Sequence, residues 1–441
     1  MISFLLNKNI QSNVVNFLFS IIPASYIAGT LVLNLNIALF LISTILFYGK
    51  NVFRINLHLV DKLILFFFTF VLFTGIFNFI DLHYFKGEDY ALTKNFGVSV
   101  LIKSLSYTRY LLLYFVVRFL IENKIINFKI FLISCAFFTL FVSFDIFYQL
   151  IFGKDIFGFE PSLQPVKYSG PFDYEYVAGG YLQRFVLLSL FLIPVFYKSK
   201  SKTFLFISTS IMFVIYLSAI IISGNRMPLL LFLFMIFLLS LLEKKLRKYL
   251  IYYLSASILI FMIILNLNES IKNNFINFSD RLQTMSKSII TMEMGSSREN
   301  SNLKEFTTFY GTWQMNKYIG GGIKSFRINC WQRKNIQSWE SGACNTHPHN
   351  YYLEILTDLG IVGFFILSTI FLIVIYQSIV KRYFFSTDLK NNSLMTPFMF
   401  IFLMEVFPIK SSGSFFTTTN ATFFFLILAI TVAFSRKLDL N

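Results

Sequence analysis

The chain has 441 residues, of which 56% are hydrophobic and 14% are charged, and its mean hydropathy is +0.66. A soluble domain carries about 25% charged residues, so this composition excludes a soluble globular core and indicates a membrane protein. The formal net charge of +16 does not indicate nucleic-acid binding, because the cations lie at the ends of apolar runs rather than on one soluble face.

Apolar runs of membrane-spanning length recur along the whole chain. About 20 apolar residues cross the ~30 Å hydrocarbon core of a bilayer. The run that begins at Val14 is not followed by a convincing cleavage signature, so we expect it to be a retained span. The sequence therefore predicts an all-α integral membrane protein, a single polytopic domain over residues 1–441 with about twelve transmembrane helices. We expect them near residues 14–32, 34–49, 62–80, 98–119, 128–151, 178–197, 203–222, 227–242, 249–266, 352–380, 394–408 and 416–434.

The distribution of Lys and Arg predicts the orientation of the chain. The two termini and alternate connections, with the helix ends next to them, hold 19 Lys and Arg residues. The other side holds nine once the long segment 267–350 is set aside, because long loops translocate regardless of charge. Positive charge marks the cytoplasmic side, so we expect both termini in the cytoplasm, which agrees with an even number of spans.

Two external segments stand out between the predicted helices. Residues 152–177 are rich in Gly, Pro and aromatic residues, and residues 267–350 form a polar segment of 84 residues. A loop of that length without structure of its own is uncommon unless it is functional. We expect the longer segment to contain short helices over the membrane face and to carry the chemistry of the protein.

The three cysteines fall in two settings. Cys135 lies in a predicted span, where it is expected to be a small packing residue. Cys330 and Cys344 both lie in the long external segment, and disulfides persist in oxidising compartments. We predict a Cys330–Cys344 disulfide, because closing a loop of ~15 residues is worth ~3 kcal/mol in the chain-entropy model. Two unrelated free thiols are the alternative.

The stretch Thr346-His347-Pro348-His349-Asn350 marks the point where the long external segment re-enters the membrane as a helix. Two of the four histidines of the chain are here, and an imidazole pKa of ~6.5 suits a general base near neutral pH. A metal site is less favoured, because two His around one Pro form an awkward chelate that no Cys, Asp or Glu completes at familiar spacing. A His pair that only caps the helix remains an equal alternative.

Two arginines outside this stretch are candidates for phosphate binding. The tight turn 223–228 places Arg226 between two long apolar runs, at the outer membrane boundary. A guanidinium binds phosphate oxygens in pairs, whereas the alternative is an Arg that snorkels at a helix end. Arg298, in the long external segment, is a weak signal alone. It gains weight beside Arg226 and His349, since two cations suit a diphosphate and one base suits a hydroxyl.

Ionisable residues also occur within the predicted spans, namely Arg109, Asp145, Arg184 and Glu405. Such residues are costly in a membrane and are usually functional or paired. Arg109 and Arg184 are candidates for substrate binding if they lie near external helix ends, and Asp145 could pair with one of them. The chain has no P-loop and no nucleophile elbow, which argues against an ATP-driven pump.

At this point the motifs resemble those of a known family. His349-Asn350, followed after nine residues by Gly360 and then by Gly363, resembles the signature of the O-antigen ligase and O-antigen polymerase superfamily. The resemblance covers nearly the whole chain, including twelve expected spans and a large loop before the last helices. Other similar segments are the Ser-Gly-x-Arg turn 223–226, the Ser-Arg pair 297–298, the loop 169–172 and the turn 414–416.

The resemblance implies a multi-spanning glycosyltransferase with a GT-C-like architecture in the bacterial inner membrane. Its donor would be a glycan on undecaprenyl diphosphate, and its acceptor a hydroxyl of lipid A–core at the periplasmic face. The family is thought to use no metal and no other cofactor, and no nucleic-acid partner is implied. Carried over by position, the assignments are His349 as the general base, Arg226 and Arg298 on the donor diphosphate, and His347, Asn350, Arg109 and Arg184 in substrate binding.

Other functions stay open at the level of sequence. The loop layout favours a ligase over a polymerase that joins repeat units, and a protein O-oligosaccharyltransferase is a further variant. His347 is not required by the family signature. A transporter of lipid-linked glycans is the alternative from another class, and it would need charged residues along a central path but no external base.

Overall fold

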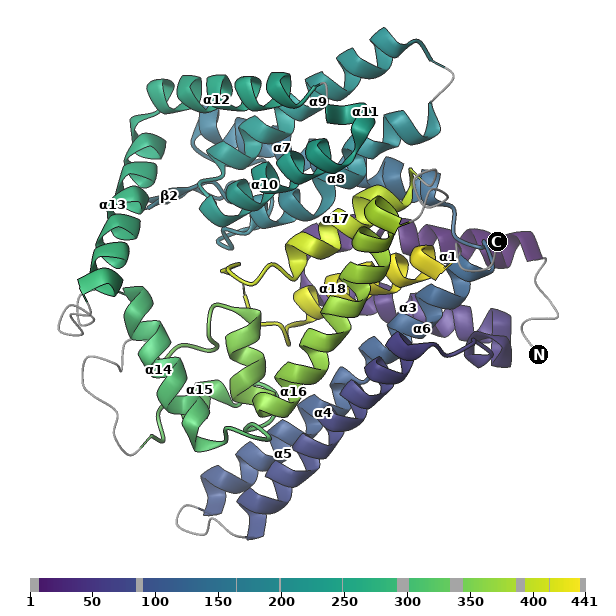
Figure 1. The fold of residues 1–441 in the computed structure, drawn as a ribbon, viewed down its shortest axis with the longest axis vertical. Helices are drawn as coiled ribbons and strands as arrows, with labels where there is room; N and C mark the ends of the chain where they lie inside the picture. The colour runs from purple at the N-terminus through teal and green to yellow at the C-terminus, as the bar shows by residue number, and fades with distance from the viewer. Residues whose placement is uncertain are drawn as a thin grey trace.

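The computed structural model describes residues 8–84, 90–163, 165–197, 200–247, 249–291, 301–333, 344–385, 393–411 and 413–436. Within these ranges the chain is helical apart from its connections and one antiparallel hairpin, in which Ser162 pairs with Lys167 and Leu163 pairs with Val166 (Figure 1). The predicted all-α membrane architecture is confirmed.

The elements in chain order are α1 (Lys8–Ser20), α2 (Ile22–Ile27), α3 (Thr30–Tyr48), η2 (Gly49–Phe53), α4 (Leu59–Tyr84), α5 (Tyr90–Tyr107), α6 (Arg109–Glu122), α7 (Phe128–Phe152), β1 (Ser162–Leu163), β2 (Val166–Lys167), α8 (Ala178–Phe196), α9 (Lys202–Ile222), α10 (Arg226–Leu242), α11 (Lys244–Arg247), α12 (Leu250–Leu267), α13 (Glu269–Thr291), α14 (Ser301–Met315), α15 (Phe326–Asn329), α16 (Tyr351–Ile375), η5 (Tyr376–Phe385), α17 (Met395–Glu405) and α18 (Thr418–Arg436).

Each of the twelve predicted spans contains a helix. In the part of the chain that the structure describes, nine helices are long and apolar enough to cross a membrane, and a bent pair formed by α12 and α13 would make a tenth. The apolar helices α10 and α17 have 17 and 11 residues, fewer than the ~20 of a straight span. A total of twelve spans therefore stays a prediction.

One break in the helices lies away from the boundary that the sequence analysis gave, and a second break coincides with a predicted boundary. The first two predicted spans divide at Gly29, which has a φ of 97°, rather than at residue 33. Glycine adopts that backbone conformation at no steric cost, so the chain turns there. The helix axis also turns by 114° between Leu267 and Glu269, where the apolar α12 meets the amphipathic α13.

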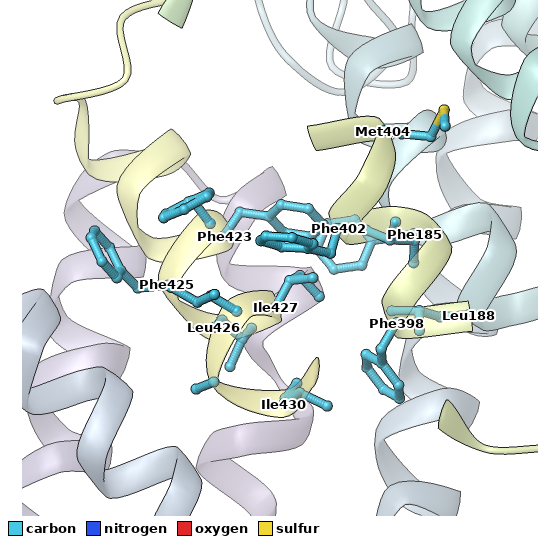
Figure 2. Close-up of a cluster of buried hydrophobic side chains, with 14 of the residues drawn as sticks. Phe185, Leu188, Phe398, Phe402, Met404, Phe423, Phe425, Leu426, Ile427 and Ile430 are labelled. Atoms are coloured by element: carbon cyan, nitrogen blue, oxygen red, sulfur yellow. The ribbon is translucent and has the colours of Figure 1, made fainter. Parts of the chain in front are cut away.

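The core of the molecule is organised around α18, which is buried along almost its whole length. Its central sequence is apolar on every side, and such a helix is expected in a core. Phe423 of α18 packs against Phe185 of α8, with ring centroids 5.5 Å apart (Figure 2). Phe434 of α18 packs against Phe398 of α17, with ring centroids 5.9 Å apart. This packing brings α8, α17 and α18 together beneath the site described below.

One end of the bundle is marked by a buried cluster of charges. Asp61, at the start of α4, accepts a hydrogen bond from Tyr114 at 2.6 Å and forms ion pairs with Arg118 of α6 and with Arg436 at the end of α18, the latter at 2.8 Å. Arg118 also pairs with Glu122 at 2.6 Å. The start of α4 and the ends of α6 and α18 therefore lie at the same end of the bundle.

The long polar segment 267–350 connects two groups of helices. Figure 1 shows α13 and α14 following one another along one side of the molecule, from the group that contains α9, α10 and α12 to the group that contains α4, α5 and α16. A disulfide bond joins Cys330 to Cys344, the pairing that the sequence predicts, with their Cα atoms 5.6 Å apart. Cys135 is a buried free thiol in α7.

Candidate functional site

The candidate site begins at the N-terminus of α16. Asn350 is the N-cap of this helix, and its side-chain oxygen accepts from the backbone amides of Tyr352 at 2.9 Å and Leu353 at 3.3 Å. Its side-chain nitrogen donates to the carbonyl oxygens of Pro408 at 2.7 Å and Lys410 at 3.2 Å. Asn350 therefore caps the helix and fixes the 408–410 segment beside it, and the two histidines are left to other roles.

His347 and His349 lie next to one another just before this cap, with ring centroids 5.0 Å apart. The His349 side chain is 41% exposed, and its Nε2 lies 4.0 Å from a carboxylate oxygen of Glu305 in α14. His347 is more enclosed, and its Nδ1 is 2.9 Å from the hydroxyl of Thr346. Burial and the neighbouring His349, Lys324 and Arg327 lower the pKa of His347 to about 4, so this ring is neutral at pH 7.

Two cations beside the histidines were missed by the sequence analysis. Lys324 precedes α15 and Arg327 lies within it, and both influence the ionisation of His347. Burial and the nearby Arg327 lower the pKa of Lys324. The site therefore combines an accessible imidazole with clustered positive charge, which suits an anionic group held next to a base.

Asp358 of α16 holds these cations in place. Its carboxylate accepts hydrogen bonds from the backbone amide of Lys324 at 2.6 Å, the hydroxyl of Ser325 at 3.0 Å and the amide of Phe326 at 3.3 Å. It therefore supplies acceptors at the start of α15, where backbone amides have no partner within the helix. Because Asp358 lies in α16, the helix that begins directly after the histidines, it fixes the loop relative to them.

The glycines of the sequence signature explain how this loop approaches α16. Gly360 interrupts the helix with a φ of 64° and a ψ of −170°. A Cβ at Gly360 would collide with the backbone of Tyr318, and one at Gly320 would collide with the backbone of Asp358. The amide of Ile361 donates to the carbonyl oxygen of Lys317 at 2.9 Å across the interruption. The loop 317–322 is thus hydrogen-bonded backbone to backbone with the break in α16, which needs glycine on both sides.

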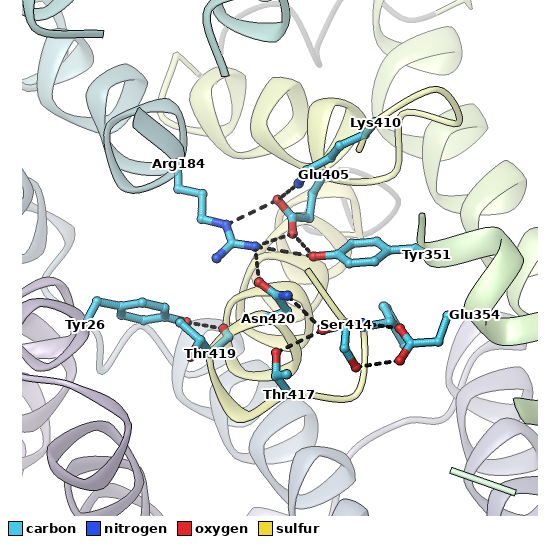
Figure 3. Close-up of polar contacts among 11 residues, drawn as sticks. Tyr26, Arg184, Tyr351, Glu354, Glu405, Lys410, Ser414, Thr417, Thr419 and Asn420 are labelled. Carbon is cyan, nitrogen blue, oxygen red and sulfur yellow. Dashed lines mark hydrogen bonds and ion pairs between the residues drawn. The ribbon is translucent and has the colours of Figure 1, made fainter. Parts of the chain in front are cut away.

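A second polar cluster includes Tyr351, the first residue of α16 (Figure 3). Glu405 of α17 pairs with Arg184 of α8 at 2.8 Å and with Lys410 at 2.7 Å, and it accepts from the hydroxyl of Tyr351 at 2.8 Å. Arg184 also donates to the side-chain oxygen of Asn420 at 2.7 Å. The Glu405 side chain is 1% exposed and that of Arg184 is 12% exposed. Two cations around one carboxylate leave this buried cluster with one positive charge.

The ion pair of Asp145 with Arg109 or Arg184 that the sequence analysis considered is not formed. Arg184 pairs with Glu405, whereas Asp145 accepts from the backbone amide of Ile156 at 2.9 Å. Arg109 is exposed, and it donates to Tyr110 at 2.8 Å and to the hydroxyl of Thr418, at the start of α18, at 3.1 Å. Arg184 and Arg109 therefore both reach the first turn of α18.

The turn 414–416 is fixed to α16 by another carboxylate. Glu354 accepts from the hydroxyl of Ser414 and from the backbone amide of Phe415, both at 2.5 Å. Glu354 and Asp358 are four residues apart on one face of α16, and each holds a different loop. Two acidic residues four positions apart in an otherwise largely apolar helix are the sequence signal that could have identified Glu354 and Asp358 as site residues.

Arg226 belongs to a different set of contacts. It begins α10, and its guanidinium carbon lies 5.1 Å from the ring centroid of Phe278 in α13. The hairpin residue Lys167 is close enough that Arg226, together with burial, lowers the pKa of Lys167. The amide of Tyr168 donates to the carbonyl oxygen of Ser223 at 3.3 Å, which ties the hairpin to the turn. Arg226, at the start of α10, and Lys167, in the hairpin, thus form a pair of cations.

Arg298 lies outside the described residues, in the stretch 292–300 that follows α13. The structure brings together His347, His349 and Asn350, and places Arg184 and Arg109 around the start of α18. Within the described ranges no group of three or more His, Cys, Asp or Glu residues could hold a metal ion.

Comparison with known proteins gives one family. Residues 211–368 match the model of the O-antigen ligase family. This part of the chain is similar to the O-antigen ligase family. This match confirms the resemblance to the O-antigen ligase and polymerase superfamily, and it spans the Arg226 turn, the long external segment and α16 through Gly363. No curated protein matches the chain. The matched segment ends before Glu405, Lys410 and Asn420, so the buried cluster of Figure 3 lies partly outside it.

Proposed function

We propose that this protein is an O-antigen ligase-like glycosyltransferase that moves a glycan from undecaprenyl diphosphate to a hydroxyl of lipid A–core, or of a related acceptor, at the periplasmic face. The family match indicates O-antigen ligase or polymerase-like activity in a multi-pass membrane protein. The observation that carries the finer proposal is the accessible His349 beside clustered cations at the capped N-terminus of α16.

His349 is the proposed general base. The acceptor hydroxyl oxygen forms a bond to the anomeric carbon of the donor while the bond from that carbon to the diphosphate breaks. The hydroxyl proton passes to a ring nitrogen of His349, and the diphosphate leaves with the bonding electrons. The carboxylate of Glu305, 4.0 Å from Nε2, stabilises the imidazolium that forms. A single displacement of this kind inverts the anomeric configuration.

The cations stabilise the leaving group. Arg226 is the proposed ligand of the donor diphosphate, and Lys167 beside it adds a second positive charge. Arg298, near in sequence to the end of α13, is proposed to complete this set. Charge developing on the diphosphate is best stabilised by donors that are already in place. In this proposal the site is periplasmic, both termini are cytoplasmic, and the architecture is GT-C-like with twelve spans.

The substitution His349→Ala tests the proposal. Loss of a general base lowers the rate of transfer by about 10²- to 10⁴-fold, so we expect transfer from a lipid diphosphate donor by the detergent-purified protein to fall by that factor. His58→Ala is the matched control, because His58 is exposed and precedes α4, away from the site. Full activity of His349→Ala, or equal loss in His58→Ala, would remove His349 as the base.

The identity of the acceptor distinguishes a ligase from a polymerase. The match to the O-antigen ligase family covers both activities. A ligase transfers the glycan to lipid A–core, and a strain without it lacks all long chains on its lipopolysaccharide. A polymerase transfers it to a second lipid-linked repeat unit, and its loss leaves single-repeat caps. Transbilayer movement of the donor without any transfer would instead indicate a transporter.

A further inference from the structure

A cavity of about 590 Å³ lies among α8, α9, α10, α12 and η5, within the range of ~300–1,000 Å³ that is usual for ligand sites. It lies away from the histidines. The side-chain oxygen of Asn225 accepts from the amide of Gly179 at 3.1 Å, so α8 and α10 begin side by side. The cavity borders their second halves, from Leu187 to Pro194 and from Ile236 onwards, towards the opposite membrane face.

The walls of this cavity have two distinct chemistries. Along the helices the lining is apolar, with Leu187, Phe191, Phe213 and Leu239 among its members. At the corner where α10 meets α11 the lining becomes charged. An apolar chamber with a charged mouth at the membrane boundary matches the shape of an amphiphile, whose chain enters the chamber while its headgroup stays at the mouth.

The charges at the mouth are mostly positive. Glu243 is paired, because Arg382 lies 3.1 Å from its carboxylate and the hydroxyl of Tyr383 donates to it at 2.7 Å. The remaining charged residues of the lining are Lys244 and Arg247, and both side chains are exposed. Three cations against one carboxylate leave an excess of two positive charges where a headgroup would lie. A basic pocket between transmembrane helices is suited to an anionic lipid headgroup.

From this geometry we infer that the cavity binds one anionic phospholipid. An acyl chain occupies the apolar chamber between α8 and α10, and the headgroup phosphate lies at Lys244 and Arg247. The paired Arg382 and Glu243 form the polar floor beneath the headgroup, with Arg382 also donating to Thr396 at 2.9 Å. This lipid is neither the donor nor the acceptor of the proposed transfer reaction, because the cavity opens at the other end of the bundle.

Native mass spectrometry of the detergent-purified protein tests this inference. Phosphatidylglycerol and phosphatidylcholine with the same acyl chains are titrated separately, and the bound fraction is read from the mass of the complex. We expect phosphatidylglycerol to bind at least tenfold more tightly. The double substitution Lys244→Ala/Arg247→Ala should reduce its affinity about 30-fold, because each cation near a lipid surface contributes on the order of 1 kcal/mol and about 1.4 kcal/mol corresponds to a factor of ten.

Two further variants distinguish specific lipid binding in the cavity from nonspecific attraction to surface charge. Lys200→Ala/Lys202→Ala removes two exposed cations, one just before α9 and one at its first residue, neither of which lines the cavity, and it should leave the affinity unchanged. Leu239→Trp should lower binding of both lipids by filling the chamber. Equal binding of the two lipids by the unaltered protein, unchanged binding in Lys244→Ala/Arg247→Ala, or an equal loss in Lys200→Ala/Lys202→Ala would overturn the inference. Transfer activity plays no part in this readout.

Discussion

At the scale of single residues, Glu405 has the largest structural consequence in the site. Its carboxylate is buried, and it is the shared partner of Arg184, Lys410 and Tyr351. Sequence analysis proposed that Arg184 binds substrate, and the structure shows the guanidinium engaged with Glu405 and Asn420. We therefore propose that Arg184 acts through this cluster, by holding α8, α17 and α18 in register below the cap of α16.

The substitution Glu405→Gln should destabilise the protein strongly. It removes the negative charge between Arg184 and Lys410 and leaves two buried cations facing one amide. Breaking a buried ion pair by removing one partner costs about 3–5 kcal/mol. The expected result is a clear fall in the thermal unfolding temperature of the protein in detergent.

The matched control for this prediction is Glu160→Gln. Glu160 pairs with Lys154 at 3.2 Å, but both side chains are more than half exposed. An exposed pair of this kind contributes ~0–1 kcal/mol, so the control should unfold close to the unaltered protein. Equal unfolding temperatures for the two variants would show that the buried cluster does not stabilise the fold.

His347 gives the protein a pH dependence of stability in mildly acidic solution. Its folded-state pKa of about 4 lies below the ~6.5 of an unfolded histidine. Between these values the unfolded chain binds more protons, so stability is full above pH ~6.5 and falls as the pH drops towards 4. Because the ring is partly exposed, we expect a loss on the order of 1 kcal/mol, and His347→Gln should remove this part of the pH profile. An identical profile in that variant would contradict the assignment.

Sequence analysis could predict the residues of the site that are neighbours along the chain. His347, His349 and Asn350 are within four positions of one another, and Cys330 and Cys344 are 14 positions apart. Lys324 and Arg327 could not be found in this way, because Asp358, more than 30 residues away, places them beside the histidines. Long-range hydrogen bonds of that kind leave no local pattern in the sequence.

At the scale of elements, the interrupted α16 is the feature that shapes the site. Its first half carries Glu354 and Asp358, and the break at Gly360 allows the loop 317–322 to approach the helix backbone. The sequence signature contained Gly360 and Gly363, but an apolar helix was expected to run straight through them. A glycine is compatible with a continuous helix, so only the positive φ reveals the break.

The substitution Gly360→Ala should release the loop from α16. The added methyl group would collide with the backbone of Tyr318, and a φ of 64° is strained for alanine. Strain of this kind costs about 1–3 kcal/mol before the collision is counted. We expect faster tryptic cleavage after Lys317 and Lys324, together with reduced transfer activity.

Gly180→Ala is the control for this loop release. Gly180 lies in the first turn of α8, and an added Cβ meets nothing within 4 Å there. Its cleavage pattern and activity should therefore match those of the unaltered protein. If Gly360→Ala retained the original rate of cleavage, the hydrogen-bonded contact between the loop and the helix would not be what orders the site.

At the scale of the whole molecule, the two ends of the bundle carry different kinds of buried charge. At one end, Asp61 joins the start of α4 to the ends of α6 and α18 through Arg118 and Arg436. At the other end, Arg184 and Glu405 join the first half of α8 to the end of α17. The hydropathy pattern predicted the helices and their alternation, because apolar length is a local property. The charge pairs were not predictable, since each joins helices that are far apart in sequence.

The separation of the two ends leads to a prediction about topology. Glu160 lies in the smaller external segment and Lys200 in the connection between α8 and α9, and both side chains are exposed. In intact cells with a permeabilised outer membrane, Glu160→Cys should react with a membrane-impermeant maleimide, whereas Lys200→Cys should react only after the inner membrane is broken. The background is low, because Cys135 is buried and Cys330 is bonded to Cys344. Labelling of Lys200→Cys in intact cells, with Glu160→Cys protected, would indicate the opposite orientation. The histidine site would then face the cytoplasm, which would contradict a periplasmic ligase.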